Sequence, residues 1–362
     1  MASATPAGYG RLLILVELKG GNDGLNTLIP YHDPAYYALR PKIAIARDAV
    51  VPVSDRCGLH PALQPLLALW NRRELALLQG VGYPAPNLSH FRSIEIWDTA
   101  SRSDQYLPNG WLTRTFARTP PPRDYAADGF VIGSYDLGPL DGGARALTLA
   151  DAAQFNDRAR FAHAEGTART PALEHILRTE SDIVQAAAQL RTNVSLATRF
   201  PASPFGNAVR TACNVIARAK GVAVVRLTLN GFDTHANQAP TQARLLAELA
   251  EGLVALEQGL TELHRWDDTL ILTYAEFGRR PRENLSGGTD HGTSNVHFAM
   301  GGRVVGGLYG AQPGLGQLST DGNLAHAIDF RSVYATALDR WWGLDSRNVL
   351  GGRFETLPIV RA

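Results

Sequence analysis

Three apolar segments of this chain each lead into a carboxylate. Asp23 follows the segment 12–18, Asp233 follows 222–229, and Glu276 follows 270–274. Two histidines lie in the same or the next polar loop, His235 and His291. Buried strands that end in acids and histidines bring distant residues to one sheet edge, which is where open α/β folds bind ligands. Carboxylates and imidazoles gathered there are typical ligands of a divalent metal ion.

Each of these residues also has a plain structural interpretation. Glycines on both sides of the Asn22-Asp23 pair let the backbone approach a ligand, but an Asx turn explains Asp23 equally well. Asp233 and His235 are two residues apart, so in an extended loop they face the same way and can share one ion. The alternative is a turn cap and a surface histidine.

Glu276 precedes two arginines, Arg279 and Arg280. It is either part of a structural ion pair or a metal ligand, with Arg279 or Arg280 gripping an anionic substrate. His291 lies in a glycine-rich loop without apolar neighbours, which favours a ligand role. His297 lies within an apolar segment, which indicates a histidine of the core.

A possible nucleophile stands at the start of a helix expected over about 90–100. Asn87 or Ser89 would cap this helix, and the N–H groups at a helix N-terminus favour an anion. Ser89 is therefore either a nucleophile or anion ligand, or a routine N-cap. His90 or His291 would relay a proton if it does not bind metal. Arg92 and Arg279 complete the candidate catalytic set.

The elements that must position these residues alternate between strands and helices. This alternation predicts an α/β fold, a three-layer sandwich with a mostly parallel central sheet. We expect one domain over 1–362 with a loop-rich elaboration at about 100–170. The expected strands are 11–18, 75–79, 130–133, 146–149, 222–229, 269–274 and 296–301. The expected helices are 61–70, 90–100, 172–191, 207–220, 242–263 and 329–342.

Composition excludes several classes of protein. The 362 residues carry a net charge of +1, which gives no reason to expect a nucleic acid or an anionic membrane as a partner. No segment approaches the roughly 20 apolar residues that span a bilayer, and the start of the sequence has no export signal. A cytoplasmic location is the default expectation. Cys57 and Cys213 are expected to be inert, buried thiols.

Six ordered motifs together resemble the DUF1501 family, over about residues 10–345. They are Gly20-Gly21-Asn22-Asp23-Gly24-Leu25-Asn26, Asn87-Leu88-Ser89-His90-Phe91, Gly110-Trp111-Leu112, Gly231-Phe232-Asp233-Thr234-His235, Glu276-Phe277-Gly278-Arg279 and Gly288-Thr289-Asp290-His291-Gly292. The resemblance implies an alkaline-phosphatase-like fold, shared with phosphatases, sulfatases and phosphoglycerate mutases. Members of the family often carry a twin-arginine export signal, which implies export by the twin-arginine pathway if the N-terminus is trimmed.

The resemblance also implies roles for individual residues. It places Asp23 and Glu276 at one metal, Asp233, His235 and His291 at the other, and Ser89 as nucleophile. Two features depart from the superfamily. The Asp…His spacing is two rather than four, which makes Asn237 an alternative ligand, and Phe277 stands where a histidine is expected.

The function expected from the residues and the resemblance is a metal-dependent hydrolase of phosphate or sulfate esters. Its nucleophile would be Ser89 or a metal-bound water, and its substrate a small anionic ester. Zn or Mn would be bound firmly at Asp233, His235 and His291, with a second ion weaker or absent. The alternatives are a non-catalytic binding protein on the same fold and, third, a mutase that passes through a phosphorylated Ser89.

Overall fold

The protein is represented by a computed structural model. The structure describes residues 8–149, 194–311 and 314–361, together with the single positions 170, 173 and 177. Apart from the single positions 173 and 177, the helix expected over 172–191 lies outside the described residues.

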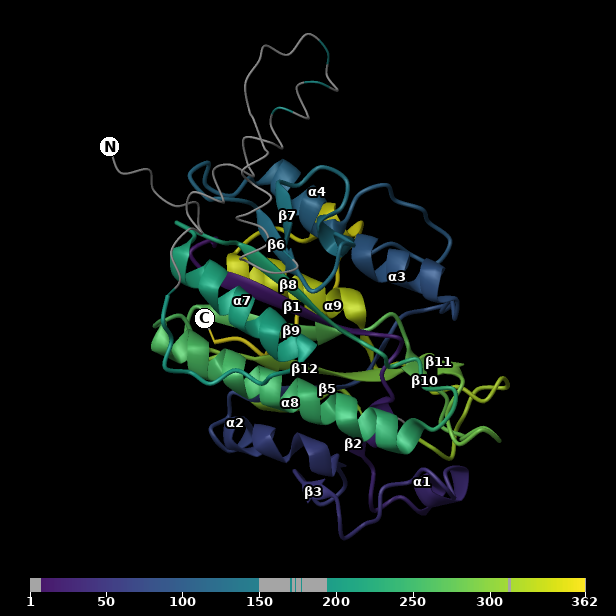
Figure 1. The fold of residues 1–362 in the computed structure, drawn as a ribbon. Coiled ribbons are helices and arrows are strands. Elements are labelled where there is room, and N and C mark those ends of the chain that lie inside the picture. The colour runs from purple at the N-terminus through teal and green to yellow at the C-terminus, as the bar shows by residue number, and fades with distance from the viewer. Residues whose placement is uncertain are drawn as a thin grey trace.

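A nine-stranded sheet runs through the described part of the chain (Figure 1). Its order is β13-β5-β12-β9-β1-β8-β6-β7, and β14 also pairs with β5. β12 is antiparallel to β5 and β9, whereas the other pairs of this sheet are parallel. The strands are β1 (Leu12–Lys19), β5 (Leu75–Gly82), β6 (Gly129–Ile132), β7 (Ala146–Leu149), β8 (Val224–Asn230), β9 (Thr269–Tyr274), β12 (Asn295–Met300), β13 (Gly307–Tyr309) and β14 (Ile328–Asp329).

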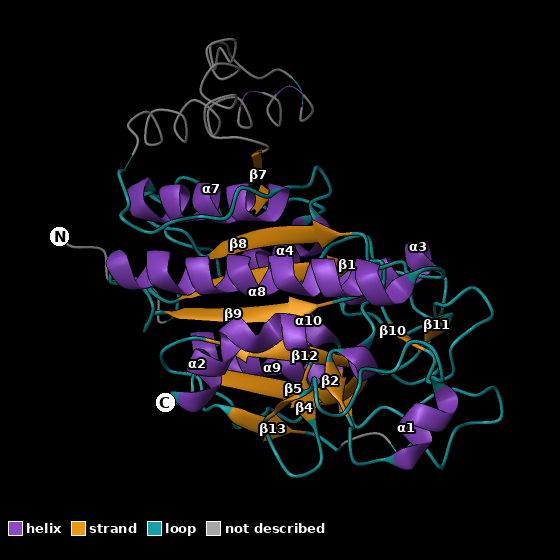
Figure 2. Ribbon diagram, turned by 60° about the horizontal axis from the view of Figure 1, so that its bottom comes forward, coloured by secondary structure: helices purple, strands orange, loops and turns teal. Residues whose placement is uncertain are grey.

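Helices cover both faces of the sheet (Figures 1 and 2). One face packs against α2 (Leu67–Asn71), α7 (Pro204–Arg218) and α8 (Gln238–Glu262), the other against α3 (His90–Thr99), α4 (Trp111–Arg118) and α9 (Phe330–Ala335). Alternate residues of β1 pack against the two helical layers, because successive side chains of a strand point to opposite faces. Leu12 and Ile14 join the first core, and Leu13 and Leu15 join the second. The expected three-layer α/β sandwich is confirmed.

Smaller elements surround this frame. They are η1 (Gly24–Asn26), β2 (Leu28–Ile29), α1 (Pro34–Leu39), β3 (Val51–Pro52), β4 (Gly58–Leu59), η2 (Pro61–Leu66), η3 (Gly138–Leu140), β10 (Gly278–Arg279), β11 (His291–Gly292), the π-helix η4 (Thr336–Trp342) and α10 (Arg347–Leu350).

The expected strands are all present, with ends that differ by a few residues. The helices differ more. The first turns of the expected helix 61–70 are a 3-10 helix that contains Pro65, a residue that removes a backbone donor. The stretch 101–149, expected to be loop-rich, includes α4, whose Trp111 and Leu112 are fully buried. The closing helix passes from α9 into a π-helix at Thr336.

Both cysteines behave as expected. Cys57 and Cys213 are free and buried, and burial raises the pKa of Cys213 to about 12. A thiol that stays protonated is a poor nucleophile and metal ligand.

No helix among the described residues is both long and apolar enough to cross a membrane.

His297 is a core residue, as its apolar surroundings predicted. It lies on β12 with 1% of its surface exposed, and its ring meets Trp97 edge-on. Neither ring nitrogen has a hydrogen-bond partner among the described residues. Burial lowers the pKa of His297 to about 3.

We expect His297→Leu to make the protein more resistant to acid. The folded pKa of about 3 lies below the ordinary value of 6.5, so between these values the unfolded chain binds the extra proton. Stability is therefore lost as pH falls through this window. In urea unfolding at pH 7, 5 and 4, the leucine variant should lose less stability than the parent. If the free energy of unfolding falls by the same amount in both proteins between pH 7 and pH 4, the prediction is contradicted.

Candidate metal centre

The carboxyl ends of β8, β1 and β9 meet at one edge of the sheet, shown at the right in Figure 2. β1 is parallel to both neighbours, with Lys19 opposite Asn230 and Glu17 opposite Tyr274. Gly20 and Gly21 then take positive φ angles of 114° and 76°. A Cβ at Gly20 would lie 2.3 Å from the backbone nitrogen of Asp233. Glycine is therefore needed for the loops after these strands to approach one another.

Three of the predicted metal ligands form a tight triangle. His235 Nε2 lies 2.9 Å from His291 Nε2 and 3.0 Å from Asp233 Oδ1. His291 Nε2 lies 3.3 Å from the same carboxylate oxygen. Tetrahedral zinc with bonds of about 2.0–2.1 Å has ligand atoms about 3.3 Å apart. The donor set and its spacing thus fit one divalent ion.

The imidazole of His291 is held with its Nε2 available to a metal. Its Nδ1 lies 2.8 Å from the carbonyl oxygen of Leu88, which can only accept, so Nδ1 carries the proton. Metal-binding histidines usually have such a partner on the second nitrogen. His235 is more open, with 45% of its side chain exposed, and its Nδ1 faces Asp290 at 3.5 Å.

His90 is the fourth group at this cluster, and it reaches there from the first turn of α3. Its Nε2 lies 3.5 Å from Asp233 Oδ2, and its Nδ1 lies 2.8 Å from Glu276 Oε1. Ligand atoms of His90, Asp233 and His291 also fall within 4.8 Å of one another. The closer separations belong to the Asp233–His235–His291 triangle, and the Nδ1 of His90 is engaged by Glu276, so His90 lies beside the triangle as a fourth group.

Glu276 supports His90, and this differs from the metal role expected for it. The side chain is buried, and its oxygens accept hydrogen bonds from the N–H groups of Gly20 and Gly21 as well as from His90. A carboxylate with so many donors is fixed in place. It orients the imidazole so that Nε2 faces Asp233.

The pKa values of His90, His291 and Asp233 are shifted in different directions by their surroundings. The hydrogen bond to Glu276 raises the pKa of His90, whereas burial lowers the pKa of His291. For Asp233, burial acts to raise the pKa, but the hydrogen bond and charge of Arg279 bring it below its ordinary value. Asp233 is thus kept ionised, His291 neutral, and His90 the group most suited to carry a proton.

Ser89 is the N-cap residue of α3, and its hydroxyl makes no capping hydrogen bond. The residue is exposed, and the Oδ1 of Asn87 accepts from its backbone N–H. Both of its chain neighbours contact the cluster, since the carbonyl of Leu88 faces His291 and the ring of His90 faces Asp233. Ser89 therefore lies beside the candidate metal centre, at a helix N-terminus.

Arg279 is not placed to grip a substrate, contrary to expectation. Its side chain is fully buried, and it donates to the carbonyl oxygens of Gly21, Thr289 and Phe232. It also donates to Asp233 Oδ1 at 2.7 Å. The guanidinium instead clamps the loops after β1, β8 and β9 and fixes the Asp233 carboxylate.

Arg92 is likewise not placed at the cluster. Its Nη2 donates to the carbonyl oxygens of Arg102, Ser103 and Gln105, and its guanidinium lies 3.8 Å from the ring centre of Tyr106. These contacts tie the 102–106 loop to the first turn of α3. Its Nη1 forms an ion pair with Glu95 at 2.8 Å, and none of these contacts reaches the cluster, so the catalytic role expected for Arg92 stays a prediction.

Asp23 lies apart from the triangle. Its carboxylate forms an ion pair with Arg40 at 2.5 Å, and both side chains have no exposed surface. Asn237, the alternative ligand, is the N-cap of α8 with a φ of 48°, and its backbone N–H donates to Ser286.

Phe277 occupies the place where the resemblance leads one to expect a histidine. Its ring lies 4.3 Å from that of His291 and 4.8 Å from that of His90, measured between ring centres. It provides no ligand atom, but it packs against both imidazoles.

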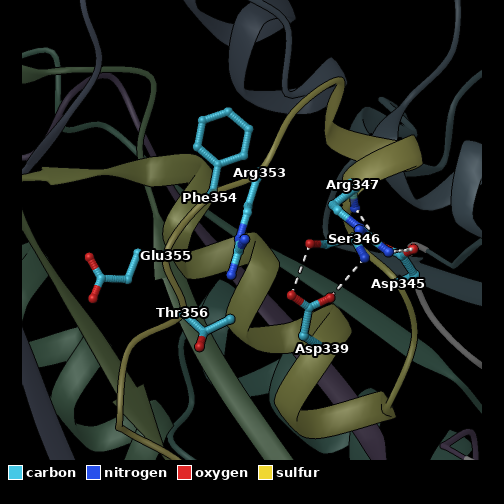
Figure 3. A pocket seen from close by; sticks show the side chains of 8 residues that line it. All are labelled: Asp339, Asp345, Ser346, Arg347, Arg353, Phe354, Glu355 and Thr356. Carbon is cyan, nitrogen blue, oxygen red and sulfur yellow. Dashed lines mark hydrogen bonds and ion pairs between the residues drawn. The ribbon is translucent and has the colours of Figure 1, made fainter.

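The structure also has a cavity of about 830 Å³ away from the cluster, lined by eight residues of the segment 339–356 (Figure 3). There Arg347 forms an ion pair with Asp345, and the hydroxyl of Ser346 donates to Asp339. None of the cluster residues lines it.

We expect Glu276→Gln to lower the pKa of His90, because an amide cannot stabilise the imidazolium as a carboxylate does. The ring resonances of His90, followed by NMR as a function of pH, measure this shift. Glu283→Gln is the matched control, since that carboxylate accepts from the backbone of Lys42 and Ile43. The same His90 pKa in both variants would contradict the positioning role.

Comparison with known proteins gives a family but no activity. No curated protein matches the chain. The C-terminal periplasmic domain of EcEptC from Escherichia coli is similar at 10% identity and a TM-score of 0.43, covering 99% of this chain and 92% of that one. The PsFucS1 sulfatase from Pseudoalteromonas sp. has 10% identity and a TM-score of 0.42, covering 96% and 70%. An alkaline phosphatase superfamily protein from Vibrio parahaemolyticus has 11% identity and a TM-score of 0.41, covering 99% and 73%.

These three likenesses are too distant to carry an argument about function. The family match is more specific, and it agrees with the resemblance seen in the six motifs. The family model, described as a protein of unknown function, matches residues 11–352. The chain therefore belongs to the DUF1501 family.

Proposed function

We propose that this chain is a metal-dependent hydrolase of phosphate or sulfate esters. The observation that carries the proposal is the triangle of Asp233, His235 and His291, with atoms 2.9–3.3 Å apart at the carboxyl edge of the sheet. Three protein ligands leave a coordination position open, which is the arrangement of catalytic rather than structural zinc sites. Zn and Mn both accept such a donor set.

The chain's own residues divide the remaining work. A divalent ion held by the triangle would supply a Lewis acid for the ester oxygen. Ser89 presents an uncapped hydroxyl at the start of α3, where backbone N–H groups and the helix dipole favour negative charge. His90, oriented by Glu276, is the proton carrier at Nε2.

In the proposed reaction, Ser89 Oγ forms a bond to phosphorus or sulfur as the bond to the alcohol oxygen breaks. The serine proton leaves to His90, and His90 returns a proton to the departing alcohol. Water then attacks the phosphorus or sulfur of the Ser89 ester as the bond to Ser89 Oγ breaks. Inorganic phosphate or sulfate is released, and His90 passes the proton of the water to Ser89 Oγ. Arg279 takes no direct part in this scheme, because its donors bind the chain and Asp233.

The second candidate is a non-catalytic binding protein. The packing of Phe277 on both imidazoles favours it, because this position supplies a ring in place of a ligand atom.

Hydrolysis of p-nitrophenyl phosphate and p-nitrophenyl sulfate separates the two candidates. The protein is assayed as purified, after removal of metal with a chelator, and after addition of Zn or Mn. Activity that is lost on chelation and restored by one of these ions supports the hydrolase. A protein that binds the ion but turns over neither ester supports the binding protein.

A further inference from the structure

The two residues expected to hold a second metal ion, Asp23 and Glu276, are both already saturated with donors. Asp23 Oδ1 accepts from the Leu25 N–H and from Arg40 Nη2, and Oδ2 accepts from Arg40 Nη1 and Gln238 Nε2. A carboxylate offers about four lone-pair sites, so those of Asp23 are filled. The oxygens of Glu276 are similarly engaged by two glycine N–H groups and by His90.

All five guanidinium N–H groups of Arg40 donate hydrogen bonds around Asp23. Besides the two bonds to Asp23, Nη1 donates to Asn26 Oδ1, while Nε and Nη2 donate to the carbonyl oxygens of Pro281 and Arg280. The planar guanidinium meets the carboxylate with two parallel bonds, the strongest geometry for this pair. Its side chain has no exposed surface. A buried cation without a free donor is a fixed part of the fold.

We propose that Arg40 takes the place of a second metal ion, so that the metal centre holds one ion only. The guanidinium supplies the positive charge that the buried Asp23 carboxylate requires. A divalent ion at Asp23 would have to displace Arg40, leaving a buried arginine without its partner. This inference rests on the proposed hydrolase and deepens it, because it sets the number of ions with which that enzyme works.

The Asp23–Arg40 pair also positions the ligand loops through Gln238. The Gln238 Nε2 donates to Asp23, and its Oε1 accepts from the hydroxyls of Thr234 and Thr289. Thr234 lies between the ligands Asp233 and His235, and Thr289 lies two residues before His291. The buried amide of Gln238 therefore connects the Asp23–Arg40 pair to both loops that carry the proposed metal ligands.

Titration of the metal-free protein with Co²⁺, followed by the visible absorption of the bound ion and by elemental analysis, counts the ions. We expect one equivalent per chain. Mn²⁺ loaded in its place should give the electron paramagnetic resonance spectrum of an isolated ion, without the exchange coupling of a close pair.

A matched pair of variants shows which aspartate binds the ion. Asp233→Asn should bind Co²⁺ at least about 100-fold more weakly, because it loses a ligand. Asp23→Asn should keep one equivalent and the same visible spectrum, while its Tm falls by about 5 °C as Arg40 loses its charge partner. The titration of the unmodified protein decides the question even if Asp23→Asn does not fold.

The outcomes separate this inference from the proposed function. Two equivalents in the unmodified protein, or a coupled Mn²⁺ spectrum, would overturn the single-ion centre and leave the hydrolase standing. No bound ion at all would overturn the hydrolase, and the single-ion centre with it.

Discussion

Replacing His291 by alanine is expected to remove the bound ion and to lower kcat by about three to four orders of magnitude. The substitution deletes one corner of the Asp233–His235–His291 triangle and leaves two ligands, too few to hold Zn or Mn firmly. It also frees the Leu88 carbonyl, which fixes the imidazole from the other side. Elemental analysis and the p-nitrophenyl ester assays measure both effects.

His32→Ala is the control for this variant, because His32 is an exposed histidine that contacts Arg47. It should keep metal and activity. Retention of the ion by His291→Ala would show that a different set of residues binds it.

Replacing Ser89 by alanine is expected to lower kcat by about four orders of magnitude without changing metal content. The fold should not suffer, because the Ser89 hydroxyl makes no capping hydrogen bond to α3. The loss of a nucleophile can therefore be distinguished from the loss of a helix cap. Turnover of both esters, ion content and the free energy of unfolding are measured on the same preparation.

Ser203 offers the matched comparison. It is the N-cap of α7, and its hydroxyl does accept from the Gly206 N–H. Ser203→Ala should lose about 1 kcal/mol of stability and keep full activity, the reverse of Ser89→Ala. Full activity in Ser89→Ala would instead make water the nucleophile.

The sequence predicts the frame of this protein well because the frame depends on local patterns. Short apolar runs form β1, β8 and β9, and their parallel pairing brings the loops that carry Asp233, His235 and His291 to one edge. Asp233 and His235 come just after β8, and that position is enough to predict their place at this edge, whereas His291 lies on β11 within a later loop. The same pattern is not enough to assign each carboxylate its partner.

The roles that the structure does not support depend on contacts between distant segments. Arg40 lies between the strand expected over 11–18 and the helix expected over 61–70. Its partners are Asp23 in one loop and two carbonyl oxygens more than 200 residues away. Nothing in the local sequence indicates that pairing. The substrate role expected for Arg279 has the same difficulty, since the acceptors of its side chain are backbone carbonyls of other loops.

Two functional contacts have only partial signals in the sequence. The Glu276–His90 pair joins two residues that the sequence marks as a metal ligand and a proton relay rather than as partners. Gln238 begins a helix shortly after the loop that carries Asp233 and His235, where a buried amide is easily read as a surface residue. Its burial becomes visible only from its contacts with Asp23, Thr234 and Thr289.

Anomalous diffraction at the metal absorption edge tests the central claim most directly. Crystals of the protein loaded with Zn²⁺ should show one anomalous peak per chain, about 2.0–2.2 Å from Asp233, His235 and His291. The Asp23 carboxylate should remain on Arg40 without a peak beside it. A peak bound by Asp23 and Glu276, or the absence of any peak at the Asp233–His235–His291 triangle, would contradict the account.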